Sequence, residues 1–384
     1  MIYLDNSATT QPCGAAVIAV REMLEARWFN PSAPYREAVE AERYMEKART
    51  SIAQTLGIGA KELYFTGSGT EADSLAILGA AARFRGPRRV LLFAAEHPAV
   101  RETQAQLQAM GHEVAFVPAT GEGLVDIDAF REMLDDQVSL VSCMHVGNET
   151  GAVQPLAEIG RLMRVANPEA LLHVDGVQGY LRLPIALKAA GVDLYTISAH
   201  KVHGPKGVGA LAVRKGVKLA PRIAGGGQES GLRSGTENTA GIAGFAAAVQ
   251  WVSSQQDASG HLRGMKLRLY HQLQEGIEGL RVNGPDPCSD QAAPHILNVS
   301  LPGVGGEVML HALEQEGVLV GTGAACSSKK RDMSAAFAAM HAPKWAAESA
   351  IRFSFGLMNT PEDADRAAEA VLRCHTRYKA FQRR

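Results

Sequence analysis

Short apolar runs alternate with helical patterns between about residue 60 and residue 215 of this chain. The runs expected to form strands are 63–66, 90–94, 113–117, 139–144, 170–174, 194–198 and 209–213. The segments expected to form helices between them are 70–83, 98–110, 126–134 and 155–166. Two of these helices begin at a proline, a residue that a first helical turn tolerates. The alternation predicts an α/β fold with a mostly parallel sheet covered by helices on both faces.

The pattern changes in segment 224–238, AGGGQESGLRSGTEN, which is too rich in glycine for a strand or a helix. Beyond it, the segments expected to form helices are 240–253, 260–279 and 361–381. Short strands are expected over 295–301 and 318–320. We therefore expect a large domain over 14–254, and a smaller α+β domain made of 255–384 together with 1–13.

Composition and charge narrow the class of protein. Of the 384 residues, 46% are hydrophobic and 21% are charged, which is ordinary for a globular protein. Lysine and arginine total 39 against 40 acidic residues, so no strong field favours nucleic acid or an anionic membrane. The chain lacks an apolar run of about 18 residues, and its start, MIYLDNSATT, does not resemble a signal peptide.

Cysteine usage indicates the compartment. The five cysteines lie at long spacings with no C-x-x-C pair, which argues against a disulfide framework and against a zinc site. They are Cys13, Cys143, Cys288, Cys326 and Cys374. The sequence predicts a soluble, reduced, cytoplasmic protein without a bound metal.

A glycine-rich loop, TGSGTEADSLAIL (66–78), leads from an expected strand into an expected helix. Free backbone N–H groups at a helix N-terminus bind phosphate, and Gly69 would let the ligand approach closely. Thr70 could add its hydroxyl group. The alternative is an ordinary helix cap. A nucleotide-binding P-loop is excluded because its lysine motif is absent.

Two ionisable residues follow neighbouring strands in the pattern. Asp175 ends one strand, where a carboxylate could pair with a cationic ring nitrogen. Lys201 follows the next strand, where a desolvated amine could react with an aldehyde. Either residue alone is more often a capping aspartate or a solvated lysine. Together with the phosphate loop, they predict a site for pyridoxal phosphate.

Eight segments in order along the chain match motifs of one enzyme family. They are YLDNSATT (3–10), EHPAV (96–100), VGNETGAVQP (146–155), HVDGVQ (173–178), SAHKVHGPKGVG (198–209), GGGQESGLRSGTEN (225–238), GAACSS (323–328) and IRFSFG (351–356). The sequence resembles the cysteine desulfurases, which belong to the class-V aminotransferases among the fold-type-I pyridoxal-phosphate enzymes. The resemblance implies removal of sulfur from L-cysteine to give L-alanine.

The resemblance also implies roles around the cofactor. His97 would stack on the cofactor ring and assist proton transfer. Asn148 and Gln178 would lie near the phenolic oxygen, Asn148 also near the substrate. Ser198 and His200 would join Thr70 at the phosphate.

Three further roles concern the substrate, the partner subunit and the sulfur. Arg352 would bind the substrate carboxylate, a task that suits a bidentate guanidinium. Thr236 would reach the phosphate of the partner in a homodimer. Cys326 would attack sulfur and carry it as a persulfide, and its loop, rich in small residues and followed by Lys329, is typical of an exposed reactive thiol. The acceptor would be a carrier or scaffold protein, for example one for iron–sulfur cluster assembly.

Several alternatives remain open from the sequence. A selenocysteine lyase or an aminotransferase could have the same fold and cofactor, although an aminotransferase would not need Cys326. A regulatory nucleotide-binding module would need no reactive lysine. A sulfur carrier would need Cys326, but not Lys201 together with Asp175.

Overall fold

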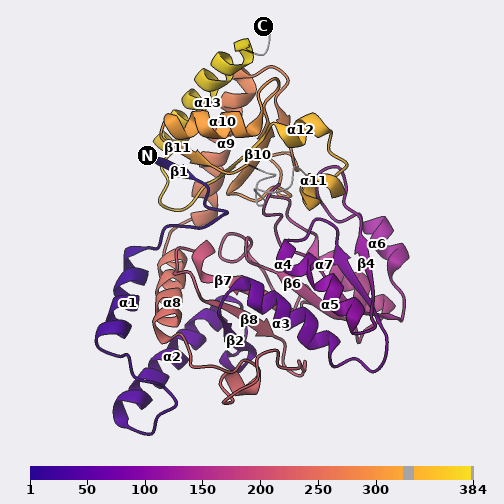
Figure 1. Ribbon diagram of the computed structural model, residues 1–384, viewed down its shortest axis with the longest axis vertical. Helices are drawn as coiled ribbons and strands as arrows, with labels where there is room; N and C mark the ends of the chain where they lie inside the picture. Colours follow the sequence, from indigo (N-terminus) through magenta and orange to yellow (C-terminus); the bar gives the residue numbers. More distant parts are fainter. Residues whose placement is uncertain (323–332, 382–384) are drawn as a thin grey trace.

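The computed structural model describes residues 1–322 and 333–381, and Figure 1 shows them as two stacked parts. The lower part in that view holds α1 to α8 and strands β2 to β8, while the upper part holds α9, α10 and α13 with β1, β10 and β11. The indigo N-terminal strand β1 lies with the C-terminal elements. In the described part, none of the helices combines the length and apolar character that crossing a bilayer requires.

A seven-stranded sheet forms the centre of the lower part, in the order β2-β8-β7-β6-β5-β3-β4. Its strands are β2 (Leu63–Thr66), β3 (Arg89–Phe93), β4 (Glu113–Val117), β5 (Val138–Ser142), β6 (Leu171–Asp175), β7 (Leu194–Ser198) and β8 (Gly209–Val213). β8 runs antiparallel to β2 and β7, and the other pairings are parallel. The prediction of a mostly parallel sheet is confirmed, and each predicted strand is present within two residues of its expected bounds.

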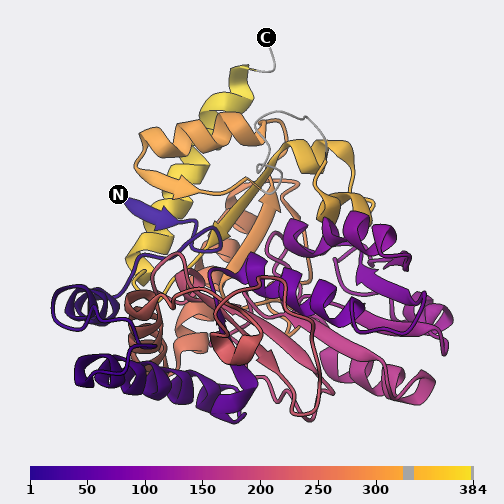
Figure 2. The same cartoon turned by 60° about the horizontal axis from the view of Figure 1, so that its bottom comes forward.

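Helices cover both faces of this sheet, as Figure 2 shows from below. In β3, Val90 and Leu92 point to one face while Leu91 and Phe93 point to the other, and all four are buried. The first face packs against α3 (Gly69–Ala81), α4 (Pro98–Arg101) and α5 (Thr103–Ala109). The second packs against α2 (Arg36–Thr55), α6 (Ile127–Met133), α7 (Leu156–Ala166) and α8 (Thr239–Ser253).

The upper part has an apolar core of its own. An antiparallel sheet of order β12-β10-β9 packs there, beside a parallel pair of β1 and β11. The strands are β1 (Ile2–Leu4), β9 (Arg281–Val282), β10 (Ile296–Ser300), β11 (Val318–Val320) and β12 (Ala350–Ser354). The helices are α9 (Ala258–Gly276), α10 (Gly306–Gln315), α11 (Ala335–Ala339), α12 (Lys344–Glu348) and α13 (Pro361–Phe381). The domain boundaries given above stay a prediction.

One predicted helix is wrong as a single element. Segment 98–110 forms two helices, α4 and α5, which meet at Glu102. The buried Thr103 hydroxyl donates to the carbonyl of Val100 at 2.6 Å. Such a local side-chain bond competes with the helical backbone ladder, which accounts for the break.

Helix α1 (Gly14–Glu25) was not predicted, nor were α2 and α10 to α12. Helix α1 leaves Val17, Ile18 and Leu24 exposed and buries mainly small residues. Its apolar positions are therefore not confined to one face, and the helical period is hard to recognise in the sequence.

Candidate active site

A cavity of about 220 Å³ lies at the carboxyl edge of the large sheet. The predicted residues that line it are Gly69, Thr70, His97, Asn148, Asp175, Gln178, Ser198, His200 and Lys201. These residues lie at or beyond the carboxyl ends of β2, β3, β5, β6 and β7. Because these five strands all run in the same direction, their ends meet at one edge, where open α/β sheets bind ligands.

The glycine-rich loop forms one end of the cavity. Ser68 is the N-cap of α3, and its hydroxyl accepts the N–H of Glu71 at 3.1 Å. A Cβ atom at Gly69 would lie 3.0 Å from Val177 Cγ2 and 3.3 Å from Ser198 Cβ. The glycine therefore lets the helix N-terminus pack against the end of β7. Thr70 is not the cap, and it is exposed at the cavity.

Asp175 is buried at the end of β6. One of its oxygens accepts the N–H of Val177 at 2.9 Å. Burial, followed by the negative charge of Asp73, raises the pKa of Asp175 to about 6. A cation in the cavity would favour the ionised form of this carboxyl group, and the carboxylate would stabilise the cation in turn.

Behind Asp175 lies a buried polar cluster that the sequence analysis missed. The ring of His173 contacts Ser142 Oγ at 2.8 Å and Asp73 Oδ1 at 3.4 Å, and Ser142 donates to Glu96 at 3.2 Å. Burial raises the pKa of Asp73 to about 7 and lowers that of His173 to about 4. A possible signal in the sequence was Asp73, the one charged residue in the otherwise apolar or small stretch 72–82.

Lys201 lies just beyond β7, in a short 3-10 turn. Its Nζ donates to the backbone carbonyl of Ala8 at 2.8 Å and also to that of Ser7. Burial, followed by the positive charges of Arg182 and Arg352, lowers the pKa of Lys201 to about 8. A sizeable fraction of this amine is therefore neutral near physiological pH.

Arg182 and the N-terminal segment hold the Lys201 loop in place, and the sequence analysis gave neither a role. The buried Arg182 donates to the carbonyl of Lys201 at 2.5 Å and to Gln178 Oε1 at 3.0 Å. The amide of Gln178 donates in turn to the carbonyl of Ser7 at 2.9 Å. Gln178 thus lines the cavity and also binds the N-terminal segment.

Both predicted histidines are held in the neutral form. Burial lowers the pKa of His97, and it lowers that of His200 to about 4. His97 is the N-cap of α4, where its Nδ1 accepts the N–H of Ala99 at 3.1 Å. A neutral imidazole that accepts at Nδ1 carries its proton on Nε2, so His97 is a donor there. His200 contacts the hydroxyl of Thr9 at 3.1 Å.

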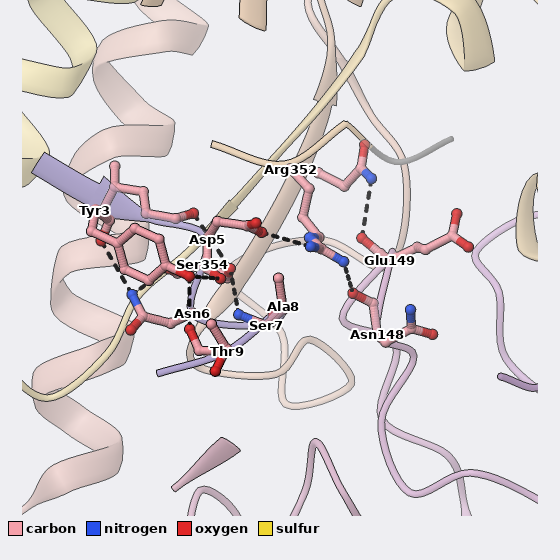
Figure 3. A network of polar contacts seen from close by, with 12 residues as sticks. Tyr3, Asp5, Asn6, Ser7, Ala8, Thr9, Asn148, Glu149, Arg352 and Ser354 are labelled. Carbon is pink, nitrogen blue, oxygen red and sulfur yellow. Dashed lines mark hydrogen bonds and ion pairs between the residues drawn. The ribbon is translucent and has the colours of Figure 1, made fainter. Parts of the chain in front are cut away.

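Arg352 in β12 does not line the cavity, but it contacts a residue that does. Its NH1 donates to the carbonyl of Asn148 at 2.9 Å, and its NH2 lies 2.7 Å from Asp5 Oδ1 (Figure 3). Glu149, next in the chain, is half-buried, and the desolvation of its carboxyl group raises its pKa to about 7. The guanidinium therefore stands at the Asn148 side of the cavity with a carboxylate already bound.

The remaining predicted residues lie elsewhere. Thr236 is exposed and does not line the cavity of its own subunit. Its loop is fixed by two ion pairs, Arg49 with Glu229 at 2.7 Å and Arg233 with Glu71 at 2.7 Å. Cys326 lies outside the described residues. Within 1–322 and 333–381, no group of three or more acidic, histidine or cysteine side chains is placed to hold a metal ion.

Known proteins resemble this chain over almost its full length. The family Aminotransferase class-V matches residues 2–367. A NifS/IcsS protein homolog of Lactobacillus delbrueckii subsp. bulgaricus is 36% identical over 95% of this chain and 94% of its own. The cysteine desulfurase IscS of Dictyoglomus turgidum is 36% identical over 97% of this chain and 94% of its own.

Solved structures agree with this likeness. A NifS-like protein superposes with a TM-score of 0.90 at 33% identity, covering 97% of this chain and 98% of that one. The structure of SspA in complex with cysteine has a TM-score of 0.81 at 28% identity, covering 92% of this chain and 99% of that one. The chain thus belongs to the class-V aminotransferase family.

Proposed function

We propose that this protein is a pyridoxal-phosphate-dependent cysteine desulfurase, which takes sulfur from L-cysteine and releases L-alanine. The observation that carries the proposal is the single cavity into which Thr70, Asp175 and Lys201 all face. Relatives named cysteine desulfurase at 34–36% identity support the choice of reaction within the family.

The cavity suits pyridoxal phosphate in its chemistry. The helix N-terminus with Thr70, Ser198 and His200 would hold the phosphate. Asp175 would pair with the ring nitrogen and Lys201 would bond to the aldehyde carbon. Ser7 lines the cavity, and its buried Oγ has no hydrogen-bond partner among the described residues. This hydroxyl group can therefore form a hydrogen bond with a bound group.

Lys201 and His97 would divide the proton transfers. When bound, the cofactor withdraws electrons from the amino acid and so weakens its bonds at Cα. The lowered pKa of Lys201 leaves a neutral amine that can accept the Cα proton. Neutral His97 would supply a proton from Nε2, because its Nδ1 is occupied. Lys201 would thus act as the base and His97 as the acid in the same cavity.

In this proposal Arg352 binds the substrate and Cys326 takes its sulfur. Arg352 would bind the cysteine carboxylate beside Asn148. The Cys326 thiolate would attack the substrate sulfur, so that a sulfur–sulfur bond forms as the carbon–sulfur bond breaks. The electron pair left on carbon is then protonated, which yields alanine. Cys326 keeps the outer sulfur as a persulfide until a thiolate of a carrier or scaffold protein accepts it.

A homodimer is part of the proposal. The loop 224–238 exposes Thr236 while the pairs Arg49–Glu229 and Arg233–Glu71 hold the loop against α2 and α3. This arrangement supports the proposal that Thr236 contacts the phosphate in the cavity of the partner subunit. The sequence leaves the identity of the sulfur acceptor open, with an iron–sulfur scaffold protein as the first one to test.

The deciding experiment incubates the enzyme with L-cysteine and a thiol reductant, and measures sulfide and alanine. The wild type should release both in equal amounts. Lys201→Ala should release neither and should lose the visible absorption of the bound cofactor. Cys326→Ser should keep that absorption but release no sulfide.

Cys288→Ser is the matched control, because Cys288 is an exposed thiol outside the cavity. It should retain wild-type rates. Full activity of Cys326→Ser would sink the nucleophile assignment. Alanine production from selenocysteine alone would instead identify a selenocysteine lyase, and amino-group transfer to a keto acid an aminotransferase.

A further inference from the structure

Arg352 binds an internal carboxylate, although its proposed partner is the carboxylate of the substrate. Asp5 follows β1 and forms a β-bridge with Ser354 of β12, two residues beyond Arg352. This backbone contact brings Asp5 Oδ1 to 2.7 Å from NH2 of Arg352 (Figure 3). The pair is largely shielded from water, with side-chain exposures of 11% for Arg352 and 23% for Asp5.

One nitrogen of the guanidinium has no hydrogen-bond partner among the described residues. NH2 is bound to Asp5 and NH1 to the carbonyl of Asn148. The Nε–H is buried and has no partner among the described residues. Because Nε is shielded, a substrate carboxylate has to compete with Asp5 for NH2, one of the two donors that a guanidinium presents along this edge.

Gly321 lies directly beside this ion pair. A Cβ atom at position 321 would lie 2.8 Å from NH2 of Arg352, 2.8 Å from Asp5 Oδ1 and 3.2 Å from Nε of Arg352. Any other residue would press on the ion pair. The glycine therefore allows Asp5 and Arg352 to meet at this point of the fold.

Two carboxylates on one guanidinium repel each other. Asp5 partly neutralises the charge of Arg352 and keeps the side chain pinned against Asn148. A substrate carboxylate that approaches Arg352 meets the negative charge of Asp5 in a poorly hydrated place, where charges interact more strongly than in water. Its affinity is lower than an unpaired arginine would give.

We propose that Asp5 is a specificity-determining residue that sets how strongly Arg352 holds the carboxylate of substrate and product. This inference rests on the proposed function. L-Cysteine and L-alanine both carry an α-carboxylate group. An Arg352 without Asp5 beside it would therefore retain the product as firmly as it binds the substrate. Moderate binding favours turnover, since binding substrate and product more tightly does not lower the chemical barrier.

The test compares binding of two probes to the holoenzyme by calorimetry. 3-Mercaptopropionate carries a thiol and a carboxylate but no amine to react with the cofactor, and 3-mercaptopropionamide lacks the charge. Asp5→Asn removes the charge of Asp5 while keeping its shape and a hydrogen-bond acceptor. The Kd of the carboxylate should fall about fivefold, and that of the amide should stay unchanged.

Asp128→Asn is the matched control, because Asp128 pairs with Arg131 at 2.9 Å on the surface of α6 and its loss changes the net charge equally. It should change neither Kd. A mere loss of structure would weaken binding, so the predicted tightening distinguishes a specificity role from a structural one. If Asp5→Asn fails to fold, Asp5→Ser carries the same expectation.

An unchanged or raised Kd for 3-mercaptopropionate in the charge-free variants would overturn the proposal, and so would an equal gain for the amide. In turnover, Asp5→Asn should lower the KM for cysteine and strengthen inhibition by alanine by similar factors. A wild-type enzyme that binds the carboxylate probe but makes no sulfide would contradict the proposed function alone, because the binding comparison tests Asp5 directly.

Discussion

The floor of the cavity and the corner around Arg352 are built in different ways. On the floor, Asp175 ends β6 and Lys201 follows β7, and the register of these adjacent parallel strands fixes their spacing. At the corner, Asp5, Asn148 and Arg352 come from three segments that are far apart in the sequence. The floor is thus a product of one sheet, and the corner forms only when both parts of the molecule are folded together.

The two regions also differ in charge. The floor gathers buried groups whose pKa values are displaced, with Asp73 at about 7 and Lys201 at about 8. The corner holds an ion pair whose charges largely cancel. Displaced pKa values are typical of groups that exchange protons, whereas a balanced pair is suited to holding a charged ligand. We therefore expect changes to the floor to affect the rate of the chemical step, and changes to the corner to affect binding.

The strongest test of this division is Asp175→Asn. The amide keeps the acceptor for the N–H of Val177, so the fold should persist. Without the carboxylate, no negative charge holds the ring nitrogen, and kcat should fall about 10²–10³-fold with a small change in KM. Steady-state kinetics with cysteine measures both. A kcat within a few-fold of wild type would mean that the floor does not control the chemical step.

The next effect in size is expected from Arg352→Gln. Loss of the guanidinium should raise the KM for cysteine about 30-fold, because the substrate carboxylate loses its charged partner. The kcat should change much less. Asp5 loses its partner as well, so the double variant with Asp5→Asn should bind better than Arg352→Gln alone. A fall in kcat with unchanged KM would assign Arg352 to the chemistry and remove the contrast between the two regions.

The floor could be predicted from the sequence because its signals are local. An apolar run that ends in Asp175, and another followed by Lys201, place both residues at the same edge of a parallel sheet. The same reasoning found the strands of the large sheet. It missed α1, whose exposed Val17 and Ile18 obscure the helical period.

The corner could not be predicted in the same way. Nothing near Asp5 in the sequence indicates that it meets Arg352, since the contact depends on the β-bridge between Asp5 and Ser354. Arg182 was missed for a similar reason: its donation to the carbonyl of Lys201 depends on how two loops pack. Contacts that form only when distant segments pack together leave no characteristic residue spacing in the sequence.

A third prediction concerns the protonation of the floor. Because the pKa of Lys201 is lowered to about 8, its neutral fraction rises about tenfold per pH unit below 8 and levels off above it. The rate at which pyridoxal phosphate combines with the apoprotein should follow this curve in a stopped-flow absorbance experiment. Free Nα-acetyl-lysine, with an unshifted amine, serves as the reference and should keep accelerating to about pH 10. A protein curve that matches the reference would show that burial does not activate Lys201.

The smallest effect is expected from Asp73→Asn, and it tests whether the buried carboxyls of the floor reduce stability. Burial raises the pKa of Asp73 from 3.8 to about 7, so between these values the folded protein binds more protons than the unfolded chain. Its contribution to the free energy of unfolding therefore falls as pH rises through that window. Asparagine does not titrate, so the variant should gain about 2 °C in Tm over wild type at pH 8, and less at pH 5.

Melting curves at saturating cofactor measure this Tm difference. The exposed Asp128→Asn variant is the control, and its Tm difference from wild type should not vary with pH. An equal Tm difference at pH 5 and pH 8 would mean that neighbouring groups stabilise the ionised Asp73 carboxylate. The floor would then tolerate its buried charges as well as the corner does.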